Sequence, residues 1–209
     1  SSLRSSIVSH AKTLGYTPTS ARASKAIVDV TLNTTDSSLT MPAGTVFNTT
    51  VDGTTYKFST ITDVTKSNTG NSIPFLNTDI YEGTFITTRY TVDSSDIDQR
   101  FLLTDNRADT TTLTVKVQTS SSDSTTTTYT KTTDITQVTA SSNVYYLQEV
   151  EAGLFEIYFG DGVIGSALSD GNIVILTYVV SNKSLANGAS LFTNAATIAS
   201  VSDVAVATV

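Results

Sequence analysis

The sequence predicts a mainly β protein of the β-rich α+β class, with a short N-terminal helix followed by antiparallel β-meanders in two subdomains. Threonine, a residue common in strands, occupies 40 of the 209 positions, and 27 serines accompany it. Several short runs alternate apolar and polar residues, as half-buried strands do. Asp-Gly dipeptides, which favour tight turns, separate some of these runs.

The helix is predicted over residues 3–14. Apolar residues recur there at helical spacing, and Gly15 and Pro18 supply a stop. The apolar positions are Leu3, Ile7, Ala11 and Leu14. The remainder of the first subdomain, residues 1–70, is predicted to be a β-meander.

That meander begins with a strand over residues 27–32. Its apolar face is formed by Val28, Val30 and Leu32. A turn at Gly44 leads into the next strand, and Asp52-Gly53 predicts a hairpin turn before residues 56–58.

A link rich in serine, threonine and asparagine at residues 66–72 places the subdomain boundary near residue 70. The second subdomain, residues 71–209, is predicted to be a β-rich domain with Asp-Gly hairpins. Its first strand candidates are residues 73–76, 84–92, 101–103, 113–117 and 144–147. The low-complexity tract 119–128 has nothing apolar to bury, which predicts a long exposed hairpin tip.

The stretch from Phe155 to Val180 is predicted to form a tight meander of strands joined by two Asp-Gly turns. Residues 173–180 are apolar on nearly both faces, which indicates a central strand covered on both sides. The residues predicted to serve as structural turns along the chain are Gly44, Gly53, Gly160, Asp161, Gly162, Gly165, Asp170 and Gly171. We expect Gly162 to have a positive φ and to contact no ligand.

The spacing Gly160-x-Gly162-x-x-Gly165 matches the dinucleotide-binding fingerprint, but its context argues against nucleotide binding. In that fingerprint the glycines open a long helix whose N-terminus receives the pyrophosphate, whereas only residues 166–169 precede the next turn here. No acidic residue about 20 positions further on could hold a ribose hydroxyl. The glycines are therefore predicted to be turn residues.

Composition excludes several classes of partner. The net charge is −7 and the twelve Lys and Arg residues are scattered, so no nucleic acid is expected, since phosphate binding needs clustered cations. The absence of cysteine excludes disulfides, thiolate catalysis and most zinc sites. No apolar run approaches the roughly 20 residues of a membrane span, so no membrane partner is expected. The chain lacks an initial Met and ends in a strand-like run, and we expect a fragment of a longer polypeptide.

No constellation of residues points to catalysis. His10, the only histidine, follows Ser9 on the predicted helix, where neighbouring side chains point about 100° apart and cannot form a relay. Asp93, Asp96 and Asp98 could hold calcium, but the run lacks the glycine and the distal glutamate of a calcium loop. A turn with solvated charges is the favoured interpretation.

Three glutamates, Glu149, Glu151 and Glu156, flank a predicted strand pair. A glycosidase would be expected to combine paired carboxylates with stacking aromatics, especially Trp, and this chain has no Trp. We therefore expect edge or solvent-face charges. The sequence predicts no enzyme, no catalytic, cofactor-binding or metal-binding residues, and no cofactor.

Segments along most of the chain resemble the large baseplate wedge subunit of T-even-like contractile-tailed bacteriophages. They are residues 3–16, Ile80-Tyr-Glu-Gly-Thr84, Tyr146-Leu-Gln-Glu149, Phe155-Glu-Ile-Tyr-Phe-Gly-Asp-Gly-Val-Ile-Gly165 and Gly171-Asn-Ile-Val-Ile-Leu-Thr-Tyr178. Met41-Pro-Ala-Gly-Thr-Val-Phe47 is also similar to the proline-glycine turn of the wider baseplate J-like family. The threonine-rich tract 119–128 departs from the resemblance, since its length and composition match no feature of that family.

The resemblance implies a non-enzymatic scaffold that joins wedges into a continuous ring around the tail hub. Its partners would be other baseplate wedge proteins and further copies of itself, and its location would be the virion tail baseplate after assembly in the host cytoplasm. A cysteine-free chain suits such a reducing compartment.

Two other classes of function stay open at this point. A threonine-rich, β-structured cell-surface adhesin or secreted binding module would have a similar composition. An extracellular hydrolase is less favoured, because no active site can be assembled from the sequence.

Overall fold

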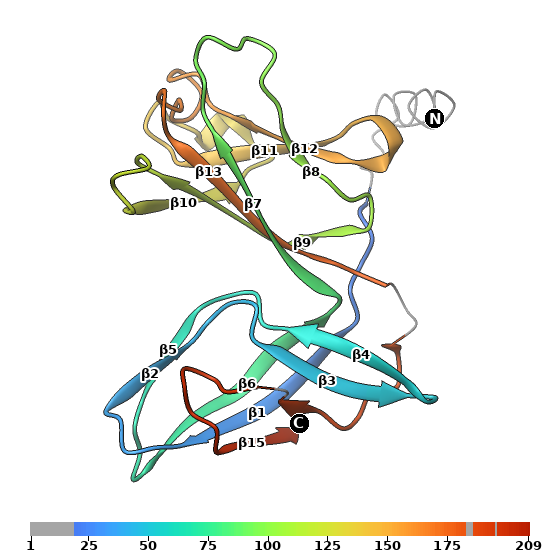
Figure 1. Ribbon diagram of the computed structural model, residues 1–209. Coiled ribbons are helices and arrows are strands. Elements are labelled where there is room, and N and C mark those ends of the chain that lie inside the picture. The colour runs from blue at the N-terminus through green and yellow to red at the C-terminus, as the bar shows by residue number, and fades with distance from the viewer. Residues whose placement is uncertain (1–18, 183–185, 195) are drawn as a thin grey trace. The chain divides into compact units, whose positions relative to one another are not determined.

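The computed structural model describes residues 19–182, 186–194 and 196–209, and these are mainly β (Figure 1), as predicted. The strands are β1 (Lys25–Asn33), β2 (Ser38–Met41), β3 (Val46–Val51), β4 (Thr54–Ser59), β5 (Val64–Ser67), β6 (Ser72–Glu82), β7 (Thr84–Thr91), β8 (Phe101–Leu103), β9 (Ala108–Gln118), β10 (Thr126–Lys131), β11 (Val144–Glu149), β12 (Phe155–Phe159), β13 (Ile173–Val180), β14 (Thr193–Asn194) and β15 (Val204–Thr208). Short 3-10 helices occur at η1 (Ile135–Gln137) and η2 (Glu151–Gly153). The predicted helix 3–14 lies outside the described residues.

The chain divides into two compact units, one inserted into the sequence of the other. The flanking unit consists of Arg22–Phe85 and Val179–Val209, and the insert unit consists of residues 19–21 and Ile86–Tyr178. This division differs from the boundary predicted near residue 70, which falls in the turn between β5 and β6. That turn marks a local break in the chain, whereas the division into units depends on which distant strands pair.

The flanking unit contains a six-stranded sheet in the order β14-β3-β4-β6-β1-β15 and a two-stranded sheet of β2 and β5. β1 pairs antiparallel with both β6 and β15, so it is an inner strand. As predicted, Val28, Val30 and Leu32 of β1 are fully buried. The core also includes Phe58, whose ring meets that of Phe192 edge to face with centroids 5.0 Å apart.

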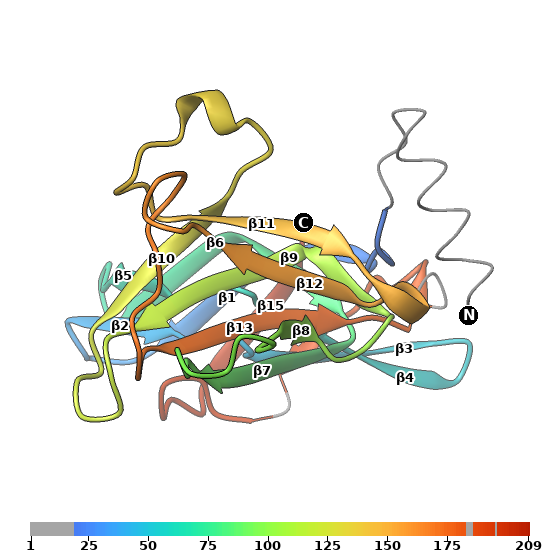
Figure 2. The same cartoon turned by 90° about the horizontal axis from the view of Figure 1, so that it is seen from above.

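The insert unit contains a seven-stranded sheet in the order β7-β13-β9-β10-β11-β12-β8. β9 and β10, β11 and β12, and β12 and β8 pair antiparallel, whereas β10 and β11 are parallel. The two edge strands, β7 and β8, lie close to each other (Figure 2). The hydroxyl of Tyr90 on β7 donates a hydrogen bond of 2.7 Å to the Leu102 carbonyl on β8. The sheet is therefore curved, and the contact between its edge strands leaves less of either edge free.

Several local predictions from the sequence are confirmed. Asp52 and Gly53 link β3 to β4 as a two-residue hairpin loop, with φ values of 50° and 78°. Positive φ at both positions is the requirement of a type I′ turn, which Asp-Gly meets readily. β13 lies between β7 and β9 and is buried along most of its length, so it is the inner strand that its apolar run predicts.

The predicted meander from Phe155 to Val180 is wrong. In the sheet, β12 and β13 are separated by β9, β10 and β11, and Val163 lies in no strand. Asp161-Gly162 forms a compact loop instead, because the Asp161 carboxylate accepts hydrogen bonds from the amides of Val163 and Ile164, both at 2.9 Å. Those amides are then unavailable for pairing with β12. The same dipeptide thus forms a hairpin in one place and a capped loop in another.

The threonine-rich tract 119–128 is divided between a loop and a strand. Residues 119–125 form the exposed connection of the β9–β10 hairpin, which agrees with the prediction of a hairpin tip. Thr126, Thr127 and Thr128 belong to β10 and pair with β9. Asp123 orders the tip, since its carboxylate accepts a hydrogen bond from the Thr125 amide at 2.9 Å.

Candidate functional site

The insert unit has a cleft of about 290 Å³ beside β12. Most of its lining residues are apolar, and acidic and amide residues accompany them. The lining residues are Val92, Asp96, Gln99, Phe101, Glu156, Ile157, Tyr158, Phe159, Gly160 and Leu168. Two connections contribute to it: the first loop, residues 93–99, between β7 and β8, and the second loop, residues 160–168, after β12. We call this the insert cleft.

An aromatic row supports the floor of the insert cleft. Successive rings of Tyr90, Phe101, Phe159 and Tyr129 meet edge to face, with centroids 5.7, 5.5 and 5.4 Å apart. Edge-to-face pairs of this kind fix ring orientation. Phe101 and Phe159, the two middle members, also line the cleft. The cleft surface is therefore held in one shape by residues from four different strands.

Glu156 brings a buried carboxylate to the wall of the insert cleft. Glu156 is only 5% exposed. Its carboxylate accepts hydrogen bonds from Arg100 Nε at 3.0 Å and Nη2 at 2.6 Å, and from the Tyr158 hydroxyl at 3.0 Å. The hydrogen bonds from Arg100 hold the pKa of Glu156 below its ordinary value, against the opposing effect of burial. The side chain of Arg100 is itself half exposed, so the cation of this ion pair is accessible to solvent.

The first loop is ordered by its own aspartates. Asp93 accepts hydrogen bonds from the amide and hydroxyl of Ser95, and Asp96 accepts one from the Asp98 amide at 3.0 Å. These bonds are Asx turns, in which a carboxylate replaces a backbone acceptor. The Ser95 hydroxyl holds the pKa of Asp93 below its ordinary value. Ile97 is left 94% exposed at the tip of the loop.

The second loop depends on close approach of its own backbone. A Cβ added at Gly160 would overlap the backbone of Gly165, and the Gly162 amide donates a hydrogen bond to the Gly165 carbonyl at 2.9 Å. Gly162 and Gly165 have φ values of 84° and 90°, in the region that favours glycine. The loop exposes Val163 and Ile164.

The first loop is joined to the turn that follows the second loop. The amide and hydroxyl of Ser94 donate to one carboxylate oxygen of Asp170, at 2.9 and 3.1 Å. Asp170 lies in the turn that precedes β13, where Gly171 has a φ of 77° and donates its amide to the Val92 carbonyl. This turn therefore fixes the start of the first loop.

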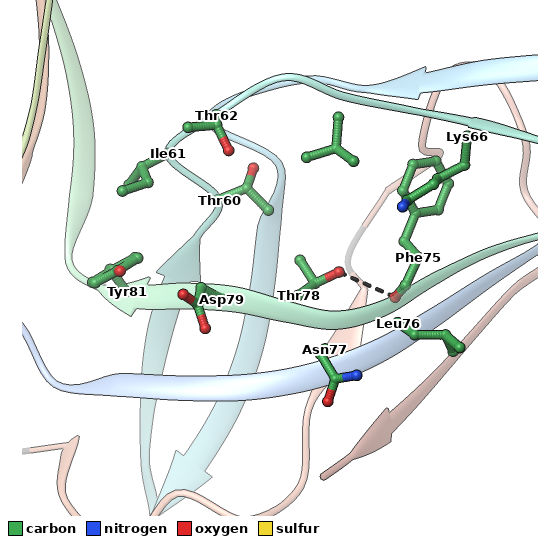
Figure 3. Close-up of a pocket in the computed structure, with 11 residues that line it drawn as sticks. Thr60, Ile61, Thr62, Lys66, Phe75, Leu76, Asn77, Thr78, Asp79 and Tyr81 are labelled. Atoms are coloured by element: carbon green, nitrogen blue, oxygen red, sulfur yellow. Dashed lines mark hydrogen bonds between the residues drawn. The ribbon is translucent and has the colours of Figure 1, made fainter.

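A second cleft, of about 320 Å³, lies in the flanking unit (Figure 3). Residues 60–62 of the β4–β5 connection stand across from β6, which contributes Leu76, Asp79 and Tyr81. β4 pairs with only the last two residues of β6, which leaves this part of β6 without a strand neighbour on that side. Its lining includes three threonines and Lys66.

In the flanking unit, a buried carboxylate connects two segments that are distant in sequence. Glu82, at 0% exposure, accepts hydrogen bonds from the Ser181 hydroxyl, the Asn182 amide and the Asn182 side chain at 3.1, 3.0 and 2.9 Å. Next to it, Gly83 has a φ of 127°, and a Cβ there would overlap the Val180 carbonyl oxygen. These contacts join the segments on either side of the insert. Sequence reasoning missed both residues, because their partners are about 100 positions away.

The expectation that the glutamates near β11 and β12 are edge or solvent-face charges is wrong for two of them. Glu149 and Glu156 are 6% and 5% exposed, whereas Glu151 is exposed. Glu156 is buried because Arg100, far from it in sequence, supplies the compensating charge. The sequence did not indicate the ion pair, because Arg100 is a single arginine in a predicted loop, 56 positions before Glu156.

The described residues contain no group of three or more His, Cys, Asp or Glu side chains placed to hold a metal ion. The first loop contains three aspartates. Asp93 and Asp96 accept hydrogen bonds from backbone amides of the loop, and Asp98 is exposed to solvent. His10 lies outside the described part of the chain. None of the helices in that part has the length and apolar character needed to cross a bilayer.

The predicted turn residues are distributed over both units. Gly44 has a φ of 81° and Gly53 of 78° in the flanking unit, while Gly162, Gly165 and Gly171 have positive φ in the insert unit. Gly160 differs, since its φ is not positive and it forms a parallel bridge with Ala167. What makes glycine necessary there is the nearby Gly165 backbone.

Comparison with known proteins places the insert unit in a family. No curated protein matches the chain. The model of the third domain of bacteriophage baseplate wedge protein gp6 matches residues 84–189, which include all of Ile86–Tyr178 and make up just over half of the 209 residues. The chain therefore belongs to the family of bacteriophage baseplate wedge protein gp6.

Proposed function

We propose that this chain is the part of a wedge subunit that joins neighbouring wedges into a continuous ring around the tail hub. Membership of the gp6 family makes the chain a structural component of the phage tail baseplate that assembles with other baseplate proteins. The finer proposal adds copies of the same subunit as partners in the ring, assembly in the host cytoplasm, and kinship with the wider baseplate J-like family.

The observation that carries the proposal is the extent of the family match. It begins two residues before the insert unit and continues past its end, so the matched region is a folded unit rather than a motif. A motif of a few residues arises by chance, whereas a match over a whole sheet does not.

The chemistry of the surface supports a scaffold role. The insert cleft combines apolar residues with one ion pair, and the Glu156 carboxylate in its lining is already engaged by Arg100 and by the Tyr158 hydroxyl. We propose that the chain has no enzymatic activity and requires no cofactor. Clefts of this composition suit contact with another protein.

A labelling experiment tests the proposal against the adhesin alternative. A short peptide tag would be inserted into residues 120–124 of the full-length subunit, because this exposed hairpin tip tolerates insertion. Electron microscopy of tag-labelled virions should place the label at the junctions between baseplate wedges. Label at a position inside each wedge, away from the junctions, would contradict the ring-joining role. Label on the host cell surface and none on baseplates would favour an adhesin.

A further inference from the structure

We propose that the insert cleft docks a segment of a different protein in which one large apolar side chain is flanked by Lys or Arg. The cleft is a surface with two independent features, an apolar centre and an acidic surround, and together they specify the occupant. The identification of that protein as another baseplate subunit rests on the function proposed above, while the specificity of the cleft does not.

The apolar centre is preorganised. Phe101, Ile157, Phe159 and Leu168 line a cleft of about 290 Å³, and the edge-to-face row fixes the two phenylalanine rings. At the edge of the cleft Tyr158 is 41% exposed. A concave apolar surface beside a half-exposed tyrosine and arginine has the composition of a binding hot spot, where a single anchoring side chain is buried.

Each of the two loops that contribute to the cleft also exposes an apolar side chain. Ile97 is 94% exposed on the first loop, and Val163 is 72% exposed on the second. Asx turns hold the loops in place, and the Ser94–Asp170 contacts join the first loop to the turn after the second. A partner would therefore meet a surface that needs little reordering, which lowers the entropic cost of binding.

The charge around the centre selects the partner. Residues 93–100 and 160–172 contain five aspartates, Asp93, Asp96, Asp98, Asp161 and Asp170, and one cation, Arg100. Arg100 is already engaged by Glu156 through two nitrogens. The field around the cleft is thus negative, and Lys or Arg beside the anchoring residue would be attracted and oriented by it.

A second copy of this chain fits the surface poorly. In a two-fold dimer through the cleft each set of aspartates would face the other set, and the chain as a whole carries a net charge of −7. The same negative charge disfavours nucleic acid and anionic membranes as occupants.

A tryptophan-containing peptide tests the proposal directly, since the chain has no tryptophan of its own. The probe is the pentapeptide Lys-Lys-Trp-Lys-Lys, added to the intact 209-residue chain, with Glu-Glu-Trp-Glu-Glu as the charge-reversed control. We expect the indole emission of the lysine peptide to shift to shorter wavelength as the ring becomes buried. We expect its Kd to be at least about tenfold below that of the glutamate peptide.

Matched variants locate the binding. Ile97→Gln and Asp96→Asn should each raise the Kd of the lysine peptide about threefold to tenfold, through lost apolar contact and lost charge respectively. Ile135→Gln and Asp123→Asn are the controls, since Ile135 is an exposed apolar residue and Asp123 an Asx-turn aspartate on parts of the insert unit that do not line the cleft. These control variants should leave the Kd unchanged.

The proposal is overturned if the lysine peptide does not bind, if both peptides bind equally, or if the control variants weaken binding as much as the cleft variants do. It is also overturned if the chain dimerises in sedimentation and Ile97→Gln abolishes the dimer, since the surface would then be a self-interface. Because these measurements use the isolated chain, they stand whether or not the subunit joins wedges.

Discussion

Glu82 of the flanking unit and Glu156 of the insert unit are both buried, and their charges are compensated in different ways. In the flanking unit, Glu82 is fully buried and receives neutral donors from Ser181 and Asn182. In the insert unit, Glu156 is almost as deeply buried but receives the guanidinium of Arg100, whose side chain is half exposed. One carboxylate is closed off from solvent, and the other lies beneath an accessible cation.

The difference separates a structural contact from a surface contact. The donors to Glu82 lie about 100 residues along the chain, so this carboxylate holds together the two segments between which the insert unit is placed. Glu156 lies in the wall of a cleft, where it also receives a half-exposed tyrosine. We infer that Glu82 contributes mainly to stability, whereas Glu156 contributes both to stability and to the charge pattern that a partner meets.

The largest effect is expected for Glu82→Ala. The change removes a fully buried side chain that accepts three hydrogen bonds from Ser181 and Asn182 and leaves a cavity in its place, which should lower the free energy of unfolding by about 3 kcal/mol. Urea denaturation measures this. Glu151→Ala removes an exposed glutamate and should cost less than about 0.5 kcal/mol. If both variants lost the same free energy of unfolding, the hydrogen bonds of Glu82 would not stabilise the flanking unit.

Arg100→Met should have the next largest effect. It leaves the Glu156 carboxylate buried without its cation, and because Arg100 is half exposed we expect a loss of about 2 kcal/mol at pH 7. The pKa of Glu156 should rise in the variant, as the hydrogen bonds from Arg100 that lower it are gone. Arg89→Met is the control, since Arg89 is exposed and contacts an amide oxygen at 3.3 Å. A variant as stable as the control would show that Glu156 needs no partner.

Gly162→Val and Gly53→Val compare a turn in each unit. Both glycines have positive φ and neither has a close neighbour that a side chain would strike, so each substitution should cost about 1–2 kcal/mol through backbone strain. Gly53 joins two paired strands, whereas Gly162 lies in a capped loop. We therefore expect Gly53→Val to disturb hydrogen exchange along β3 and β4, and Gly162→Val to change only its own loop. Disturbed exchange throughout β12 in Gly162→Val would restore the hairpin interpretation.

The smallest effect concerns pH. Since the pKa of Glu156 in the folded chain is lowered, its contribution to stability is fully present above the ordinary value of 4.5. The contribution is lost as the pH falls through the folded-state pKa. The difference in unfolding free energy between the wild type and Glu156→Gln should shrink by about 1 kcal/mol between pH 6 and pH 3. A difference that stays constant over this range would contradict the account of the ion pair.

The sequence was most informative where structure depends on near neighbours. The alternation of apolar and polar residues over 27–32 predicted β1, and the apolar run 173–180 predicted that β13 is an inner strand. Asp52-Gly53 predicted a hairpin that is present, yet Asp161-Gly162 predicted one that is absent. The Asp-Gly dipeptide alone does not determine whether a hairpin forms. A hairpin requires the amides after the turn to pair with the neighbouring strand, and at Asp161 the carboxylate accepts hydrogen bonds from those amides instead.

The sequence was uninformative wherever the partner is distant. Neither the nesting of one unit within the other nor the burial of Glu82 and Glu156 could be predicted, since each depends on residues brought together by strand order. The insert cleft was missed for the same reason. Its two loops are separated by five strands along the chain, although the individual aspartates and glycines in them had been noticed as turn residues.

The most direct test of the account is wedge assembly with a subunit from which the insert unit has been removed. Gly83 lies against Val180, so a short glycine-serine linker can replace Ile86–Tyr178 while the flanking unit keeps its strands, which circular dichroism and a melting curve would verify. Sedimentation of wedges assembled with the intact subunit should give a joined, ring-sized species. With the shortened subunit we predict free wedges. Rings that form equally well without residues 86–178 would contradict the claim that this unit serves to join wedges.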